Sequence, residues 1–238
     1  MKGNLKMNTN IDNVATSISI VIPFFNEEAN VKQVLEEIGA CQPQAEIIAV
    51  DDGSSDSTWQ IISEITSVIG IRLPENRGQS AAMLAGLQRA SNDICVAMDG
   101  DGQNDPADIK KMLPYLESAD AVFGYRKSRK DSWDRRFASK AANAIRRRFV
   151  DDGIRDTGCS LKVFRKYMVA FLPPFNGLHR FMGVFFKAYD CKIVEVAVNH
   201  RPRTGGVSKY NNFNRALRGV YDLIGVSWFI KRKVDTSI

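Results

Sequence analysis

Long apolar runs are missing from this sequence. No stretch of its 238 residues approaches the roughly 20 consecutive apolar residues that a membrane-spanning helix needs. The N-terminus also lacks the order of positive, apolar and small residues that marks a signal peptide. We therefore expect a cytoplasmic protein, and its 44% of hydrophobic residues is enough for an ordinary buried core.

Cysteine and histidine are scarce and widely spaced. The four cysteines form no C-x-x-C pair, so neither a zinc site nor a disulfide framework is indicated, and buried thiols are expected. His179 and His200 lack the spacing of a metal-binding pair, so we expect both to be structural; contact of one with an acceptor is the alternative. No serine lies in a G-x-S-x-G motif, which leaves a hydrolase triad without support.

Positive charge is concentrated in one segment. The formal net charge is +6, and ten Lys or Arg residues against two acids lie between Arg126 and Arg148. Such a patch is compatible with nucleic acid, an anionic membrane surface or phosphorylated substrates.

Strands and helices are expected to alternate in the first half of the chain. Apolar runs that end at turn residues indicate strands at 18–22, where Pro23 stops the run, and at 47–50, 70–73 and 94–98. Helical spacing of apolar residues indicates helices at 27–38 with Gly39 as C-cap, at 57–65 after a capping Asp56 or Ser57, and at 79–90. This alternation predicts an α/β fold with a mostly parallel central sheet flanked by helices.

The second half is expected to extend the same domain. Its pattern indicates a strand at 121–124, a helix from Phe164 to Leu172 and a strand from Ile193 to Val198. Residues 1–16 are polar and aperiodic, so we expect a flexible leader there.

Polar clusters directly follow three of the predicted strands. They are Pro23 to Glu27, Asp51 to Gly53, and Asp99 to Gln103. Ligands of open parallel sheets bind beyond the carboxyl ends of the strands, so these clusters are expected to converge. A D-D-G sequence standing alone would be only a turn.

Asp99 and Asp101 are candidate metal ligands. They are one residue apart in a glycine-rich turn, from which two carboxylates can reach one hard cation, and Gln103 could add an oxygen. The alternative is a turn in which each carboxylate is merely solvated or bonded to nearby backbone.

Four stretches together resemble glycosyltransferases of family 2, which have the GT-A fold: IVIPFFNEEANV, IIAVDDGSSDSTW, PENRGQSAAMLAGLQRA and VAMDGDGQNDP. The resemblance implies a nucleotide-sugar donor and a bound Mg²⁺ or Mn²⁺. It implies that the donor is contacted by Pro23, Phe25, Glu27, Val50, Asp52, Asp99 and Gly100, and the metal by Asp99, Asp101 and Gln103. Many relatives have Tyr at the place of Phe25 and D-A-D in place of D-G-D, so a phenol contact to the donor is lost here.

Features of the second half narrow the resemblance to polyprenyl-phosphate glycosyltransferases, the dolichyl-phosphate mannose synthase group. They are Gly124-Tyr125-Arg126, DTGCSLKVF at 156–164 and RTGGVSKY at 203–210. The resemblance implies that Arg126, Arg203, Ser208 and Lys209 contact donor or acceptor phosphates, a task suited to Arg and Lys. The alternative for Arg203 and Lys209 is a basic surface loop.

The expected reaction is inverting transfer of a sugar, most consistent with a UDP-sugar, to a polyprenyl phosphate such as undecaprenyl phosphate, for envelope glycan or lipid modification. The catalytic residues implied are Asp101, Arg126 and Asp156. A phosphate acceptor is already anionic at neutral pH and needs no general base. The alternative acceptor is a saccharide hydroxyl, for which Asp156 would be the base.

Two segments favour contact with a membrane or a membrane subunit. Residues 133–149 place Trp133, Phe137, Ala141, Ile145 and Phe149 on one helical face beside many arginines. Residues 217–234 combine Trp228 and Phe229 with the cations Lys231 to Lys233. An ordinary core-packed helix with a basic surface is the alternative for the first segment. We expect a peripheral location on the inner face of the cytoplasmic membrane.

We expect a leader at 1–16, a glycosyltransferase domain at 17–212 with donor half 17–105 and acceptor half 106–212, and a membrane-proximal or partner-docking segment at 213–238. A nucleic-acid-binding module would explain the basic segment but not the three acidic strand ends, which would repel a polyanion. A regulatory α/β domain with a phosphoacceptor at Asp51-Asp52 would leave the second half unused.

Overall fold

The protein, seen here as a computed structural model, is built on one seven-stranded sheet in the order β3-β2-β1-β4-β6-β5-β7. The structure describes residues 17–126, 146, 149–150, 153–202 and 212–233. The strands are β1 Ile18–Phe24, β2 Glu46–Asp51, β3 Ile69–Arg72, β4 Ile94–Ala97, β5 Ala121–Arg126, β6 Lys162–Arg165 and β7 Ile193–Val198. Pairing is parallel except where β6 lies between β4 and β5, so the predicted mostly parallel sheet is confirmed.

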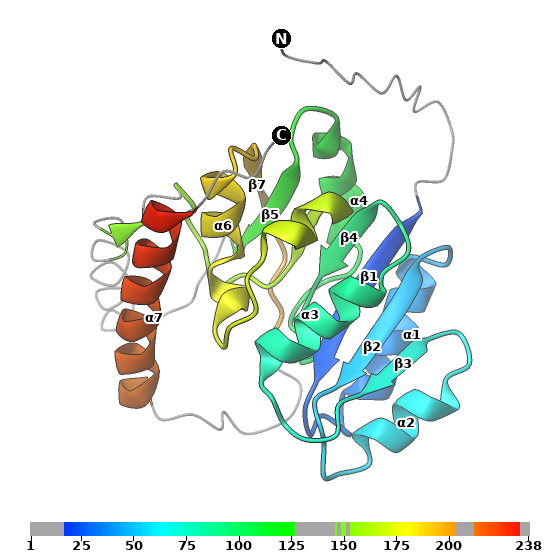
Figure 1. Cartoon of the computed structure of the whole chain (residues 1–238). Helices are drawn as coiled ribbons and strands as arrows, with labels where there is room; N and C mark the ends of the chain where they lie inside the picture. The colour runs from blue at the N-terminus through cyan, green and yellow to red at the C-terminus, as the bar shows by residue number, and fades with distance from the viewer. Residues whose placement is uncertain (1–16, 127–145, 147–148, 151–152, 203–211, 234–238) are drawn as a thin grey trace.

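Helices cover both faces of this sheet (Figure 1). The α-helices are α1 Val31–Cys41, α2 Thr58–Glu64, α3 Gln79–Arg89, α4 Asp108–Met112, α6 Met182–Ala188 and α7 Asn212–Arg232, and the 3₁₀ helices are η1 Leu113–Glu117, η2 Lys166–Phe171 and η3 Leu178–Arg180. One hydrophobic cluster lies under α3, α6 and α7, and the other lies under α1, α2 and α4. Strands β1 and β2 contribute alternate side chains to the two clusters, which explains their continuous apolar runs.

Two predicted boundaries at the first βα unit were wrong. The first strand continues through Pro23 to Phe24. Its pairing with β4 stops at Val21, so Pro23, which lacks a backbone N–H, is paired only with β2 on one side. Helix α1 begins at Val31 rather than at residue 27, and Gly39 lies inside it instead of capping it. The residues from Asn26 to Asn30 are thereby available to form a loop at the carboxyl end of β1.

The predicted helix from Phe164 to Leu172 was wrong at its start and in its type. Phe164 belongs to the short antiparallel strand β6, and the 3₁₀ helix η2 follows it. Hydrogen bonding to β4 on one side and β5 on the other holds these four residues extended. This tertiary pairing overrides the helical spacing of the apolar residues.

The surroundings of the histidines and of three of the four cysteines agree with the expected structural roles and buried thiols. Ser80 Oγ lies 2.9 Å from His179 Nδ1, and His200 forms an isolated bridge with Asn104. Cys95, Cys159 and Cys191 are buried free thiols, whereas Cys41 is partly exposed. Among the residues that the structure describes, no helix has both the length and the apolar character required to cross a bilayer.

Candidate functional site

The carboxyl ends of β1, β2 and β4 lie side by side, as predicted. Asp52 N donates to Phe24 O over 2.8 Å, and Met98 N donates to Val21 O over 3.2 Å. The loops that follow these three strands therefore start from neighbouring points of one sheet edge.

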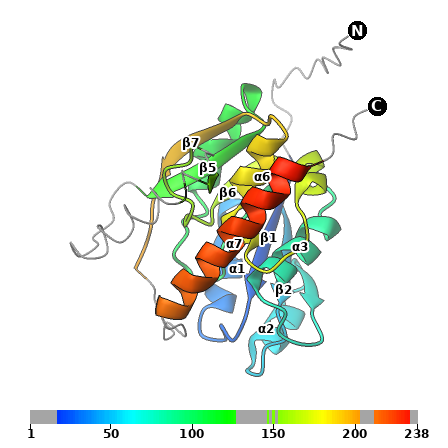
Figure 2. The same ribbon diagram turned by 60° about the vertical axis from the view of Figure 1, so that its left-hand side comes forward.

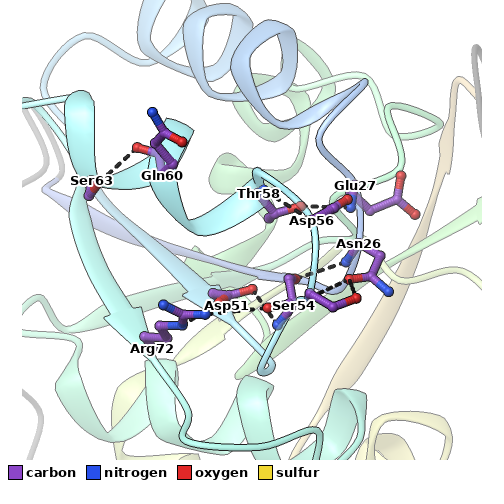
Figure 3. A network of polar contacts seen from close by, with 10 residues as sticks. Asn26, Glu27, Asp51, Ser54, Asp56, Thr58, Gln60, Ser63 and Arg72 are labelled. Atoms are coloured by element: carbon purple, nitrogen blue, oxygen red, sulfur yellow. Dashed lines mark hydrogen bonds and ion pairs between the residues drawn. The ribbon is translucent and has the colours of Figure 1, made fainter.

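The loops after β1 and β2 are joined by a polar network (Figure 3). Asn26 N donates to Ser54 Oγ over 2.9 Å, and Glu27 N donates to Thr58 Oγ1 over 2.9 Å. Asp56 Oδ1 accepts from Thr58 N, at the first residue of α2, over 3.0 Å, whereas Ser57 occupies the N-cap position itself. Asn26 has a φ of 51°, a left-handed conformation that asparagine tolerates better than most residues. The two loops consequently act as one unit around Glu27.

Asp52 anchors a third loop, the one that leads into α3. Its Oδ1 accepts from Arg77 N over 2.9 Å, and its Oδ2 accepts from Gly78 N over 2.9 Å and from Asn76 Nδ2 over 3.1 Å. Burial raises the pKa of Asp52, although both backbone hydrogen bonds oppose that rise. Contact of Asp52 with a nucleotide stays a prediction, since its carboxylate already holds this loop.

Asp99 and Asp101 lie on what we call the acidic turn, Asp99 to Gln103, after β4. Burial and, second, the nearby charge of Asp101 together raise the pKa of Asp99 to about 6. Gln79 Nε2, at the start of α3, donates to Asp99 Oδ1 over 2.6 Å. A half-buried carboxylate beside a second carboxylate favours a cation, which would offset the charge of both.

The acidic turn also has the geometry of the alternative interpretation. Asp101 Oδ1 accepts from Gln103 N over 3.1 Å, which closes an Asx turn. Within the described part of the chain, no three or more His, Cys, Asp or Glu side chains group together in a way that could hold a metal. Asp99, Asp101 and Gln103 thus supply a partial set of oxygen ligands that fits a hard cation completed by substrate phosphates.

Gly100 fits the acidic turn because it has no side chain. A Cβ at this position would lie 2.4 Å from two atoms of the Phe24 ring and 2.9 Å from Pro23 O. Phe24 is almost fully buried, so its ring cannot easily give way. The D-G-D sequence of this chain therefore goes together with the aromatic residue at the end of β1.

We expect Gly100→Ala to displace the acidic turn and to reduce the catalytic activity that the sequence predicts by roughly 100-fold, the typical effect of a small misplacement of reacting groups. The double variant Gly100→Ala/Phe24→Leu should recover part of the loss, because the smaller side chain relieves the ring contacts but not the contact with Pro23 O. Steady-state kinetics of both variants measure the effect. An alanine variant as active as the original protein would contradict the steric explanation.

Arg126 and Asp156 form a nearly buried ion pair. Arg126 Nε and Nη2 each lie 2.7 Å from one carboxylate oxygen of Asp156, and Arg126 N also donates to Asp156 Oδ2 over 3.1 Å. Only 13% of the arginine side chain and 12% of the aspartate side chain are exposed. The two residues therefore act as a unit, and their roles toward a substrate stay predictions.

The other predicted site residues differ in whether their side chains could reach a substrate. Phe25 and Glu27 are partly exposed, but the Val50 side chain is fully buried on the α3 side of the sheet, so only its backbone could meet a nucleotide. Arg203, Ser208 and Lys209 lie outside the described residues, as does most of the predicted basic helix at 133–149.

Sequence reasoning missed two buried polar residues near the acidic turn. Asn104 Oδ1 accepts from Asp99 N over 3.1 Å and from Ser160 Oγ over 2.8 Å. Lys162 Nζ donates to Cys159 O over 2.6 Å, and burial lowers the pKa of this lysine. A lysine within an apolar strand could have indicated a buried charge at Lys162. For Asn104, there was no indication in the sequence beyond its closeness to Asp101.

Comparisons with known proteins agree with this geometry. The sequence model of "Glycosyl transferase family 2" matches residues 19–172. Dodecaprenyl-phosphate galacturonate synthase of Rhizobium johnstonii is 36% identical over 230 residues, which cover 91% of this chain and 68% of that protein. Undecaprenyl-phosphate 4-deoxy-4-formamido-L-arabinose transferase of Pectobacterium carotovorum is 34% identical over 218 residues, which cover 87% of this chain and 66% of that protein. The chain thus spans about two thirds of the length of these relatives.

The fold is also similar to that of a solved enzyme. Glucosyl-3-phosphoglycerate synthase from Mycobacterium tuberculosis, in complex with Mn²⁺, UDP and glucosyl-3-phosphoglycerate, superposes with a TM-score of 0.69. The identity is 18%, and the match covers 94% of this chain and 83% of that chain. The predicted GT-A fold is therefore confirmed.

Proposed function

The chain belongs to glycosyl transferase family 2, and we propose that it transfers a sugar, with inversion, from a nucleotide diphosphate sugar to a polyprenyl phosphate. The observation that carries the proposal is the acidic turn at the carboxyl end of β4, with its two neighbouring carboxylates. The names of both relatives, which specify dodecaprenyl-phosphate and undecaprenyl-phosphate, support this class of acceptor.

The donor is proposed to lie across the ends of β1, β2 and β4. Asp99 and Asp101, with Gln103, would hold Mg²⁺ or Mn²⁺, which offsets the charge of the departing nucleoside diphosphate when bound. The joined loops around Asn26 and Glu27 would flank the nucleoside. The Mn²⁺ and UDP in the structural relative support a UDP-sugar.

The ion pair of Arg126 and Asp156 favours a phosphate acceptor over a sugar hydroxyl. A hydroxyl acceptor needs a base, but both carboxylate oxygens of Asp156 are engaged by the Arg126 guanidinium. A phosphate acceptor needs no base, and the positive charge of Arg126 would favour an anionic acceptor beside it. The remaining part of Asp156 in this reaction would be to position Arg126.

Helix α7 supports a peripheral position on the inner face of the cytoplasmic membrane. Leu223 and Val226 bury one side of the helix in the core, and Figure 2 shows α7 on the outside of the molecule. The opposite side leaves Tyr221 80% and Trp228 63% exposed, close to the exposed cations at 231–233. Aromatic residues next to cations favour the headgroup region of an anionic bilayer, and a separate membrane subunit is the other partner that this face suits.

The transfer reaction is tested with radiolabelled UDP- and GDP-sugars, undecaprenyl phosphate in detergent and either Mg²⁺ or Mn²⁺. Metal-dependent appearance of label in the organic phase supports the proposal and identifies the donor. Label transferred only to a soluble glycan contradicts it and makes Asp156 the candidate base.

Replacing Tyr221 and Trp228 together by serine should weaken binding to anionic vesicles by about tenfold or more, because both side chains would insert at the headgroup boundary. Co-sedimentation with vesicles of phosphatidylglycerol and phosphatidylcholine measures the effect. Tyr115→Ser, at another exposed aromatic residue, is the matched control. Equal binding of all three proteins would exclude α7 as the contact surface.

A further inference from the structure

A short segment after β7 is fastened to the acidic turn. Arg201 N donates to Gln103 O over 2.9 Å, and Gln103 Nε2 donates to Arg201 O over 3.3 Å. Next to them, Asn104 and His200 form an antiparallel bridge. Backbone from the second half of the chain thus pairs directly with the turn that follows β4.

The Arg201 side chain extends this connection to two further elements. Its Nη1 lies 2.6 Å from Glu37 Oε1 on α1, and its Nη2 lies 3.0 Å from Asp105 Oδ1, just beyond the acidic turn. One guanidinium therefore joins α1, the exit of the acidic turn and the end of β7. Arg suits this task because its planar head presents donors in fixed directions, which a lysine cannot do.

The acidic turn needs such external support. It contains Gly100 and Gly102, and Gly102 has a φ of 75°, so the backbone itself restricts the turn only weakly. On one side Asn104 holds Asp99 N, and on the other the Arg201 carbonyl holds the Gln103 amide nitrogen. In the proposed metal site, the second contact would fix the orientation of the Gln103 amide group.

We propose that Arg201 is a positioning residue that sets the metal affinity of the acidic turn without touching metal or substrate. The inference rests on the proposed function, in which that turn holds the metal. Groups that orient metal ligands from outside typically change metal affinity by about 10- to 100-fold when they are removed. Because Arg201 is tied to Glu37 and Asp105, its role differs from direct binding of a phosphate.

The test is a titration of the purified chain with Mn²⁺, alone and with UDP, in which electron paramagnetic resonance measures unbound Mn²⁺. Arg201→Met should raise the Kd for Mn²⁺ about tenfold, and Arg201→Lys should raise it by less, because an ammonium can satisfy only one of the two carboxylates at a time. Glu37→Gln, which removes the ion pair between Arg201 and Glu37 but leaves the one with Asp105, should give an intermediate Kd. This variant replaces Arg201→Met in the test if Arg201→Met does not fold.

Lys111→Met is the matched control. Lys111 pairs with Asp108 in the same charged region, so its removal costs the same unit of charge and one ion pair but leaves the Arg201 contacts intact. Its Kd for Mn²⁺ should stay within about twofold of the original. Melting temperatures of all variants show that each is folded during the titration.

A lower melting temperature of Arg201→Met with an unchanged Kd for Mn²⁺ would overturn the proposal, because Arg201 would then only stabilise the fold. Equal weakening by Lys111→Met would overturn it as well, since net charge would explain the effect. Failure of the proposed function is separate: the original protein would then bind Mn²⁺ with UDP but label no polyprenyl phosphate.

Discussion

Asp101→Asn is expected to lower sugar transfer by roughly 1,000-fold, equal to about 4 kcal/mol of transition-state stabilisation. The asparagine keeps Oδ1, so it can still accept the hydrogen bond from Gln103 N and preserve the turn. What it removes is one of the two negative charges that attract the cation. Initial rates at saturating Mn²⁺, with the best donor from the transfer assay, measure the loss.

The fold should survive this substitution. Removing the Asp101 charge lowers the pKa of Asp99, because that charge is one of the two causes that raise it. An acid with a raised pKa destabilises the folded state as pH rises from about 4 to 6, so metal-free Asp101→Asn should be at least as stable as the original at pH 7. Asp93→Asn makes the same charge change before β4 instead of after it, and should keep full activity. Normal activity of Asp101→Asn would show that the acidic turn is only structural.

Arg126→Met is expected to lower the free energy of unfolding by about 3 to 5 kcal/mol, since it leaves the nearly buried Asp156 carboxylate without its cation. Transfer should also fall sharply, because the methionine can neither hold Asp156 nor orient a phosphate. Urea denaturation monitored by circular dichroism measures the stability, and the transfer assay measures the activity.

The double variant Arg126→Met/Asp156→Asn separates the two effects. With the charge of Asp156 removed as well, most of the lost stability should return, whereas transfer should stay low. Asp156→Asn alone should retain part of the activity with a phosphate acceptor, because Arg126 is still present. If Asp156→Asn is as inactive as Asp101→Asn, Asp156 is a base and the acceptor is a hydroxyl.

The first half of the fold could be predicted because its central strands are buried on both faces. Runs such as Ile18 to Ile22 are apolar apart from Ser19, and turn residues separate them from the helices. Strand β6 could not be predicted in the same way, since it is four residues long and Phe164, Met168 and Leu172 recur at helical spacing. Only the neighbouring strands β4 and β5 decide that Phe164 is extended.

The candidate site likewise contains some residues that the sequence could predict and others that it could not. Asp99 and Asp101 could be found because two carboxylates close in sequence and directly after a strand are also close in space. The pairing of Arg126 with Asp156 could not, since it depends on how the end of β5 approaches a loop 30 residues later in the sequence. The same holds for Asp52, whose partners at Arg77 and Gly78 lie on the loop before another helix.

Because β6 runs antiparallel to β4, it places the segment before β6 next to the acidic turn after β4. Ala97 of β4 pairs with Lys162 of β6, and the strands run in opposite directions, so two residues beyond Ala97 and two residues before Lys162 bring Asp99 and Ser160 to the same level. Asn104 Oδ1 joins the two by accepting from Asp99 N and Ser160 Oγ. The spacing from Ser160 to β6 is therefore as constrained as the spacing within the D-G-D sequence. One residue inserted between Ser160 and Lys162 would turn the serine to the opposite face and separate the halves of the site.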